Sequence, residues 1–211
     1  MDEADIRRLA ARSVIRQLAE NKQYYVPAGI SNRHIHLSQA VLEQLFGREY
    51  ALHPERPLSQ PGQFACAEKL TLAGGRGRMD GVRVLGPVRA ETQVEITLTD
   101  SFALGIPPMV RMSGELDGTP GARLIGPAGE VTLRRGVIVA ARHLHLSEEE
   151  AGWFGLQSGD VVSVAKRGER AAVLGNVRVR AGRAHAMELH MDTDEANAAG
   201  IGSGDFLELL I

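Results

Sequence analysis

The apolar and polar positions divide this chain into a helical N-terminal segment and a longer body of short strands. Residues 2–20 are expected to form an amphipathic helix, because apolar side chains recur there at helical spacing while arginines occupy the other faces. A polar stretch at residues 21–23 then separates this helix from the body. Such a helix packs on its own domain or on a partner subunit, or it serves as a detachable targeting segment. Its apolar positions are Ile6, Leu9, Ala10, Val14 and Leu18.

The body of the chain predicts a mainly β fold. Its short runs of apolar and β-branched residues are separated by glycine, proline and Asp-Gly pairs, which is the pattern of barrels or sandwiches rather than of a doubly wound sheet. A proline-rich stretch near residues 47–67 has no counterpart in the second half of the chain and is interpreted as an insertion. The expected strands include residues 81–85, 94–98, 136–140, 160–165 and 176–180.

Two further strands, each containing a pair of histidines, run directly into short helices. Ser38 precedes an expected helix at Gln39–Phe46, and Ser147 precedes one at Glu148–Phe154. Ser147 and Glu150 fit a capping box, in which each side chain accepts a hydrogen bond from the backbone N–H of the other residue. Ser38 has no acidic residue three positions later and is expected to act as a simple N-cap.

Composition narrows the classes of function. The 211 residues are 44% hydrophobic and 24% charged, which is ordinary for a globular protein with one large or two small cores. A formal net charge of −2 and an aromatic content of 4% argue against a nucleic-acid partner. The absence of a long apolar run and of a signal peptide argues against a membrane partner and for a cytoplasmic location. Cys66 is the single cysteine, so a disulfide framework is excluded.

The chemically informative residues are concentrated in one repeated hexapeptide. Residues 33–38 (Arg-His-Ile-His-Leu-Ser) return as residues 142–147 (Arg-His-Leu-His-Leu-Ser), 109 positions later, and the two copies hold four of the seven histidines. In a strand, a His-x-His pair places both imidazoles on one face, about 6–7 Å apart. Imidazole is a common zinc ligand, so the copies predict two metal half-sites related by duplication. The alternative is a repeated strand whose histidines cap the mouth of a barrel.

Other repeated segments indicate a third ligand for each half-site. Residues 84–89 resemble residues 173–178 at an offset of 89, and residues 100–106 resemble residues 195–201 at an offset of 95. With the second offset, the residue equivalent to His190 is Glu95. Three protein donors with an open position are typical of catalytic rather than structural zinc. The two candidate sets are His34, His36 and Glu95, and His143, His145 and His190.

Anion-binding residues are expected beside the first set. Arg89 follows a Gly-Pro pair and precedes Glu95 by six positions, which suits a guanidinium that holds an anion. Ser113 could add a hydroxyl group, and Arg76 and Arg83 are candidates for further phosphates.

Two histidines are not expected to bind metal. His185 precedes His190 by five positions, an odd separation that would direct it to the opposite face of a strand. His53 lies in the insertion and is expected to be solvated.

Together these segments resemble the PduL-type phosphotransacylases, the phosphate propanoyltransferases of bacterial microcompartments. The resemblance rests on residues 31–38, on Gly-Pro-x-Arg-x-x-Thr-Gln-x-Glu at residues 86–95, and on residues 142–146, and it extends over about residues 25–211. It implies a homodimeric two-zinc enzyme that interconverts acyl-CoA plus phosphate with acyl phosphate plus CoA. It also implies two intertwined β-barrels, which follow an N-terminal helix that directs the enzyme into the microcompartment lumen. The implied domains are residues 1–22 for the helix, 23–32 plus 141–211 for one barrel, and 33–140 for the other.

Carried over residue by residue, the resemblance implies one zinc ion on each candidate set. It implies that Arg89 binds phosphate, with Ser113 nearby. The helix at residues 1–20 would bind shell or lumen proteins, and a helix this short is expected to be ordered only against a partner. CoA contacts are implied for Ile30, Ser31, Asn32, Arg76, Arg83 and Asn197.

Three functions are compatible with these residues. In the leading hypothesis, phosphate held by Arg89 and one zinc attacks the thioester carbonyl, and the other zinc polarises that carbonyl or receives the CoA thiolate. The sequence leaves open which zinc has which role, and propanoyl-CoA is the favoured substrate. A zinc-dependent thioesterase or phosphoesterase is the first alternative, and a non-catalytic, metal-stapled scaffold of the microcompartment is the second. The hydrolase would need a general base, for which the candidates are Glu91, Glu188, Asp192 and Asp194.

Overall fold

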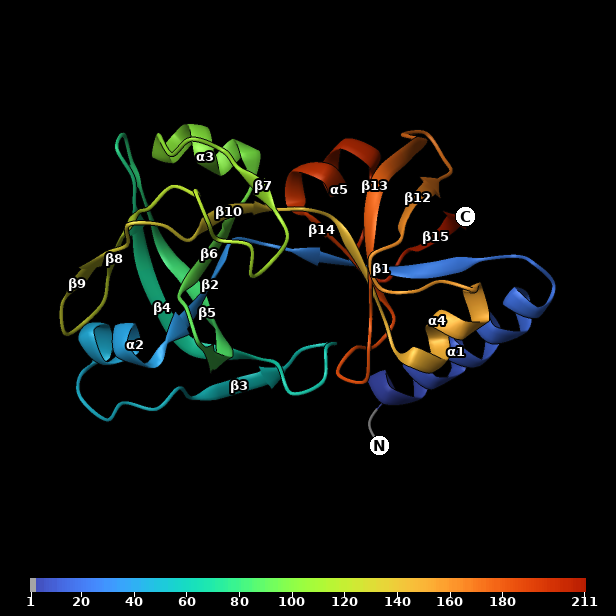
Figure 1. Cartoon of the computed structure of the whole chain (residues 1–211), viewed down its shortest axis with the longest axis horizontal. Helices are drawn as coiled ribbons and strands as arrows, with labels where there is room; N and C mark the ends of the chain where they lie inside the picture. Colours follow the sequence, from blue (N-terminus) through green and yellow to red (C-terminus); the bar gives the residue numbers. More distant parts are fainter. Residues whose placement is uncertain (1–2) are drawn as a thin grey trace. The chain divides into compact units, whose positions relative to one another are not determined.

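The structure is a computed structural model that describes residues 3–211, and the chain forms two compact units (Figure 1). The first unit contains the described residues up to Ile30, together with Arg142–Met191 and Glu195–Ile211. The second contains Ser31–Ala141 and Asp192–Asp194. Each unit therefore combines segments that are distant in the sequence. Among the described helices, none is both long enough and apolar enough to span a bilayer.

The first unit is a closed β-barrel. Its strand order is β1-β14-β11-β13-β12-β15, and antiparallel pairing of β15 with β1 closes the circle. The strands are β1 (Tyr25–Ser31), β11 (His143–Leu146), β12 (Val161–Lys166), β13 (Ala172–Ala181), β14 (Glu188–Asp192) and β15 (Phe206–Leu210), and the helices are α1 (Glu3–Glu20), α4 (Glu148–Phe154) and α5 (Thr193–Ala199).

The second unit is a curled sheet that stays open. Its strand order is β7-β10-β6-β2-β5-β4-β8-β9, and β3 pairs with β4 beside this path. The strands are β2 (His34–Ser38), β3 (Pro54–Pro57), β4 (Phe64–Ala73), β5 (Arg78–Arg89), β6 (Gln93–Ile96), β7 (Val110–Arg111), β8 (Arg123–Ile125), β9 (Glu130–Thr132) and β10 (Val137–Ala140), and the helices are α2 (Gln39–Phe46) and α3 (Leu98–Leu104).

The chain passes from the first unit to the second between β1 and β2, and back to the first between β10 and β11. Strand β1 leads into β2 along the chain, yet it pairs within the barrel of the first unit. Strand β10 leads into β11, yet it pairs with β6 in the sheet of the second unit. The mainly β fold with intertwined connectivity is therefore confirmed.

The alternation of side chains along β2 and β11 explains why both sequences form strands. Ile35 and Leu37 are fully buried in the core of the second unit, and Leu144 and Leu146 are fully buried in the core of the first. Burial of one such side chain stabilises a fold by about 1.5–3 kcal/mol. Since successive side chains of a strand point to opposite faces, these four residues direct the histidines between them away from the cores.

The structure confirms one predicted helix cap and corrects the other. Ser147 and Glu150 form the expected capping box at the start of α4. Ser38 precedes α2 but makes no side-chain capping bond, so the prediction of a simple N-cap was wrong. Its hydroxyl instead lies 3.2 Å from the hydroxyl of Thr92, which also accepts a hydrogen bond from the Ser38 backbone N–H at 2.9 Å. The side chain thus ties β2 to the start of β6.

Helix α1 packs on α4 of its own unit, so the expectation that it is ordered only against a partner was wrong. Ile15 and Ala19 are 3% and 7% exposed and join the core of the first unit. Arg12 donates to Glu149 at 2.8 Å, and its guanidinium lies 5.3 Å from the centre of the Trp153 ring. The docking face therefore differs from the apolar stripe read from the sequence.

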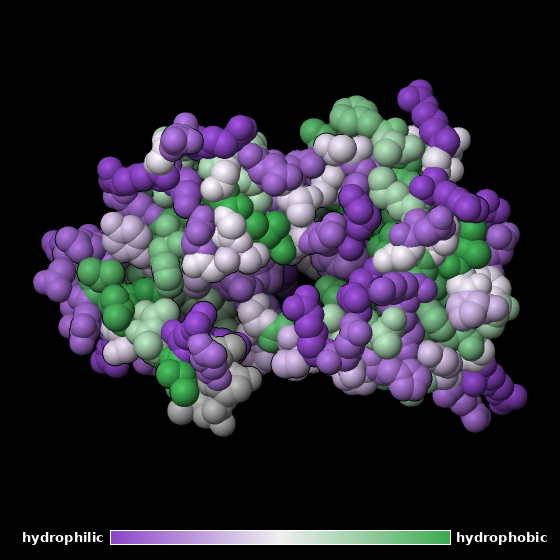
Figure 2. All heavy atoms as spheres, turned by 180° about the vertical axis from the view of Figure 1, so that it is seen from behind, coloured by the Kyte–Doolittle hydropathy of each residue, from purple (hydrophilic) through white to green (hydrophobic). Residues whose placement is uncertain are grey.

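Much of that predicted stripe remains on the surface. Ile6, Leu9 and Val14 are 52%, 53% and 54% exposed, so the packing of α1 on α4 does not use them. On the face of the molecule shown in Figure 2, hydrophilic residues surround small groups of hydrophobic ones. The exposed side chains of α1 remain available to a partner.

Candidate metal centres

Antiparallel pairing of β2 with β6 assembles the first candidate group in the second unit. His34 lies opposite Glu95 and His36 lies opposite Gln93 in this ladder. The ligand-competent atoms of His34, His36 and Glu95 all lie within 4.8 Å of one another. All three residues are at most 9% exposed. These three donors match the number of protein ligands in an open, catalytic zinc site.

Antiparallel pairing of β11 with β14 assembles the second group in the first unit. His143 lies opposite His190, and His145 lies opposite Glu188. The ligand-competent atoms of His143, His145 and His190 also lie within 4.8 Å of one another. His143 and His145 are 6% and 5% exposed, and the side chain of His190 is 21% exposed. The same ladder geometry thus produces both groups.

The strand registers identify which residues of the two repeats are equivalent. The pairs His34–Glu95 and His143–His190 occupy the same place in their ladders, which agrees with an offset of 95 for the third residue. In the parallel pairs β2–β5 and β11–β13, His34 lies opposite Arg83 and His143 lies opposite Arg178. The offset is therefore 95 here as well. The offset of 89 read from the sequence, which equates the sixth residue after Arg83 with Arg178, was wrong.

The two histidines of the first group have pKa values that are shifted in opposite directions. Burial lowers the pKa of His36 well below its ordinary value, and the positive charges of His34 and Arg89 lower it further. Burial also opposes the charged form of His34, but the charge and hydrogen bond of Glu95 outweigh it and raise the pKa of His34. The Nδ1 of His34 lies 2.8 Å from the carbonyl oxygen of Asn32 and donates to it, which leaves the lone pair on Nε2. Backbone anchoring of this kind fixes the tautomer of a metal-bound histidine.

The second group contains nitrogen atoms that require an electrophile. Burial lowers the pKa of His145, and the neighbouring His143 and His190 lower it further. The Nε2 atoms of His143 and His145 lie 3.1 Å apart, a contact that one shared proton or one cation would relieve. The Nδ1 atoms of His145 and, in the first group, of His36 are buried without a hydrogen-bond partner. The converging Nε2 atoms of His143 and His145 fit a divalent metal, because one cation could bind the lone pairs of both.

A polar network connects the first group to Arg89. Arg89 donates from Nη1 to the hydroxyl of Ser113 at 3.0 Å. The amide of Gln93 donates to the same hydroxyl at 2.8 Å and to the carboxylate of Glu95 at 2.6 Å. The backbone N–H of Gly114 donates to the amide oxygen of Gln93 at 2.8 Å, which fixes the orientation of that amide. The structure thus brings Arg89 and Ser113 to the first group, and Gln93 is a member that the sequence interpretation had not singled out.

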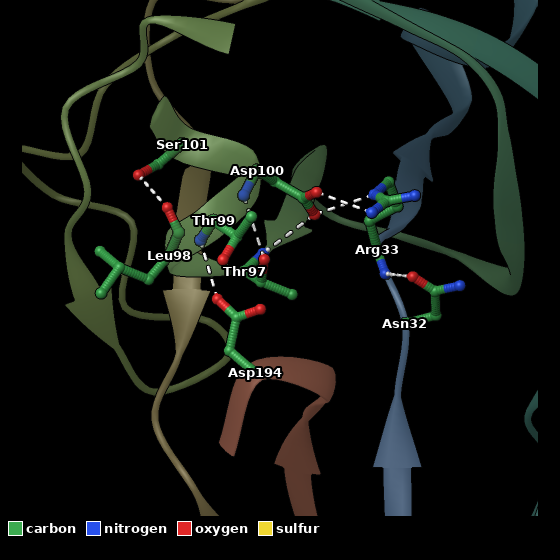
Figure 3. Close-up of polar contacts among 8 residues, drawn as sticks. All are labelled: Asn32, Arg33, Thr97, Leu98, Thr99, Asp100, Ser101 and Asp194. Carbon is green, nitrogen blue, oxygen red and sulfur yellow. Dashed lines mark hydrogen bonds and ion pairs between the residues drawn. The ribbon is translucent and has the colours of Figure 1, made fainter. Parts of the chain in front are cut away.

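Each histidine strand is preceded by an arginine held by an acidic residue. Arg33 makes two hydrogen bonds to Asp100 of α3, at 2.8 and 2.7 Å (Figure 3). Asp100 also completes a capping box with Thr97, which the sequence interpretation missed. In the first unit, Arg142 donates from Nε to Glu195 of α5 at 2.6 Å. These equivalent ion pairs fix the chain just before each pair of histidines.

The same view shows how the start of α3 is held. Asp194 accepts a hydrogen bond from the backbone N–H of Thr99 at 2.8 Å (Figure 3). The side chain of Asn32 accepts one from the backbone N–H of Arg33 at 2.8 Å. The carboxylate of Asp194 is thus engaged in holding α3, as that of Asp100 is.

The residues proposed for CoA lie in several elements. Arg83 of β5 lies opposite His34, where it donates to the carbonyl oxygen of Cys66 at 2.6 Å and forms an ion pair with Glu55. Arg76 lies in the turn between β4 and β5, and its backbone N–H donates to Leu104 at the end of α3. The remaining candidates are Ile30 and Ser31 at the end of β1, Asn32 in the turn before β2, and Asn197 on the exposed side of α5.

The two histidines that were not expected to bind metal, His185 and His53, lie in different surroundings. His185 precedes β14 in a turn, so it lies on neither face of the strand, and the stated reason for excluding it was wrong. Its ring centre lies 4.5 Å from that of His145. His53 has a side chain that is 68% exposed, and its Nδ1 lies 2.7 Å from the buried carboxylate of Glu68.

The chain is similar to known proteins of one family. The family model described as phosphate propanoyltransferase matches residues 27–202. A phosphate propanoyltransferase of Thermotoga maritima is 47% identical over 190 residues, which cover 90% of each chain. Those of Rhodobacter capsulatus and Salmonella typhimurium are 50% and 46% identical over 176 and 193 residues. These matches cover 83% and 91% of this chain and 82% and 91% of the relatives.

Proposed function

The chain belongs to the phosphate propanoyltransferase family, which makes it an acyltransferase, and on that premise we propose a zinc-dependent reaction. Acyl-CoA, with propanoyl-CoA as the favoured substrate, and phosphate are interconverted with acyl phosphate and CoA. The observation that carries the proposal is the pair of three-donor groups built by equivalent strand ladders, one of which adjoins Arg89.

Zinc is supported by the donors themselves. His36 and His145 are held neutral by burial, and their ring nitrogens converge with those of their neighbours. His34 keeps its lone pair on Nε2 because Nδ1 donates to the backbone. Two zinc ions per chain, one on each group, would supply Lewis acidity to a carbonyl oxygen and to a departing thiolate.

The residues around the first group would hold phosphate. Arg89 is partly exposed, and its guanidinium offers a fork of N–H donors that matches phosphate oxygens. The hydroxyl of Ser113 and the amide of Gln93 orient that fork, since both belong to the same hydrogen-bond network. A phosphate oxygen attacks the thioester carbonyl, the carbon–sulfur bond breaks, and CoA leaves as the thiolate. Dianionic phosphate is nucleophilic at neutral pH, so no protein base is required.

The finer features belong to the same proposal. CoA would contact Arg83 and Arg76 through its anionic groups, together with the end of β1, the following turn and Asn197. A homodimer in the lumen of a bacterial microcompartment is the proposed assembly. The exposed side chains Ile6 and Leu9 of α1 would bind a shell or lumen protein.

The decisive experiment measures CoA release from propanoyl-CoA with and without phosphate, before and after removal of metal by a chelator. We expect phosphate-dependent turnover that disappears on chelation and returns with Zn²⁺. Turnover that proceeds equally well without phosphate would identify a thioesterase instead. Metal analysis of the same preparation should find about two zinc ions per chain, and full activity in a metal-free sample would refute the zinc dependence.

A further inference from the structure

The two units place different residues at one equivalent position beside each metal group. Gln93 lies opposite His36 in the β2–β6 ladder, and Glu188 lies opposite His145 in the β11–β14 ladder. Each stands two positions before the third candidate ligand of its group, on the same face of the strand. Whatever these residues do, the duplicated fold presents them in the same place.

Each of these residues is hydrogen-bonded to that third ligand, with opposite polarity. The amide of Gln93 donates to the carboxylate of Glu95 at 2.6 Å. The carboxylate of Glu188 lies 2.5 Å from Nε2 of His190, where it accepts a hydrogen bond from the imidazole N–H. A donor thus faces the acidic ligand, and an acceptor faces the basic one.

The surroundings of both residues are built for these contacts. Gly114 and Ser113 fix the amide of Gln93, so its NH₂ group is directed at Glu95. Strand β1 makes room for Glu188, because a Cβ atom added at Gly29 would lie only 2.5 Å from the carboxyl carbon of Glu188. Neither contact is a chance meeting of flexible surface side chains.

We propose that Gln93 and Glu188 are paired positioning residues, each of which orients the third ligand of its own metal group. This inference rests on the proposed zinc dependence. A neutral imidazole that donates from Nε2 keeps its lone pair on Nδ1, so Glu188 fixes the tautomer of His190 and strengthens it as a donor. Gln93 instead holds one oxygen of Glu95 and couples that carboxylate, through Ser113, to Arg89.

A consequence is that each group contains one carboxylate at these two positions. In the first group it is the ligand Glu95, beside the neutral Gln93. In the second group it is Glu188, beside the neutral ligand His190. The negative charge that offsets a divalent cation therefore lies on the candidate ligand in the first group and on the hydrogen-bond partner of the candidate ligand in the second. Only the second group then pairs three imidazoles with a carboxylate that supports one of them.

The test measures Zn²⁺ affinity of one group at a time by competition with a chromophoric chelator. The variant Glu95→Ala isolates the second group, and His190→Ala isolates the first. In the Glu95→Ala variant, which retains the second group, adding Glu188→Leu is expected to weaken Zn²⁺ binding about 10- to 100-fold, which is typical for loss of an orienting partner. Glu188→Gln keeps an acceptor without the charge and is expected to fall in between. In the His190→Ala variant, which retains the first group, adding Gln93→Leu should weaken Zn²⁺ binding by a similar factor.

Gly29→Ala supplies an independent variant, because it displaces the Glu188 carboxylate without changing it. We expect it to mimic the Glu188 variants in the second group and to leave the first group unaffected. Thermal unfolding of each metal-free variant should match that of its parent, which separates positioning from a purely structural role. Unchanged Zn²⁺ affinities in the Glu188 and Gln93 variants overturn this inference and leave the zinc proposal intact. A wild-type chain that binds no zinc refutes both.

Discussion

Replacement of Arg89 gives the sharpest prediction about the phosphate site. Its guanidinium lies beside the first metal group, where its charge lowers the pKa of His36, and it donates a hydrogen bond to Ser113. In the proposed complex, a phosphate dianion accepts two parallel hydrogen bonds from this guanidinium. A hydrogen bond to a charged group contributes about 1.5–3 kcal/mol, so two parallel bonds contribute about 3–6 kcal/mol.

Partial exposure of Arg89 reduces that figure, because water and salt screen the interaction, and about 2–4 kcal/mol is a reasonable net value. Since about 1.4 kcal/mol corresponds to a factor of ten, Arg89→Ala should lower kcat/KM for phosphate roughly 30- to 700-fold. Arg89→Lys keeps the charge but loses the planar fork, and should retain part of the activity. The KM for propanoyl-CoA should change little in both variants.

The assay follows initial rates of CoA release at saturating propanoyl-CoA while phosphate is varied. Arg78→Ala is the matched control, because Arg78 lies on the same strand with a side chain that is 70% exposed. Zinc content must be measured in each variant, so that loss of metal is not mistaken for loss of phosphate binding. A kcat/KM for phosphate within twofold of the wild-type value in Arg89→Ala would refute the assignment.

Three further predictions follow from the same structure. Glu95→Ala and His190→Ala should each lose about one zinc ion per chain and most of the activity while the fold persists. Metal analysis measures the zinc content, and circular dichroism checks the fold. A variant that keeps two ions contradicts the ligand assignment. Burial and the neighbouring histidines depress the pKa of His145 in the metal-free fold. As pH falls below about 6.5, this histidine is therefore protonated in the unfolded chain but not in the folded one. The free energy of unfolding should then fall by up to about 1.4 kcal/mol per pH unit. Denaturant unfolding of metal-free protein at pH 7 and pH 5.5 measures this, and equal stabilities at the two values would contradict it. Ile15→Ala should destabilise the first unit by about 2–5 kcal/mol because Ile15 is 3% exposed, whereas the exposed Ile6→Ala should leave the melting temperature unchanged.

The parts of the site that follow from local periodicity were predictable from the sequence. Alternation along β2 and β11 buries Ile35 and Leu144 and directs the histidines to the other face, so the His-x-His pairs could be recognised as strands. The capping box of Ser147 is equally local, since its two members are three residues apart. These features depend only on the geometry of one element.

The features that depend on a ladder or a distant partner were not predictable in the same way. Ser38 fails as a cap because Thr92, 54 positions away, contacts its hydroxyl. The offset of 89 was inferred from the similarity of two short segments. Which residues are equivalent is decided instead by the strand registers of β5 and β13 with the histidine strands. The docking face of α1 was misread because the predicted stripe left out Ile15 and Ala19, which enter the core, and because the contact of Arg12 with Trp153 depends on α4.

The pairing of β1 with β15, the last strand of the chain, has a consequence for synthesis on the ribosome. Tyr25 of β1 finds its partner Glu208 only at the far end of the chain, so the barrel cannot close until translation is nearly finished. At about 5–20 residues per second, the wait is on the order of 10–40 s. During this time β1 is an unpaired strand with a ready template for association with other chains. Until β15 emerges, a nascent chain of this topology therefore has to keep the edge of β1 from pairing with other chains.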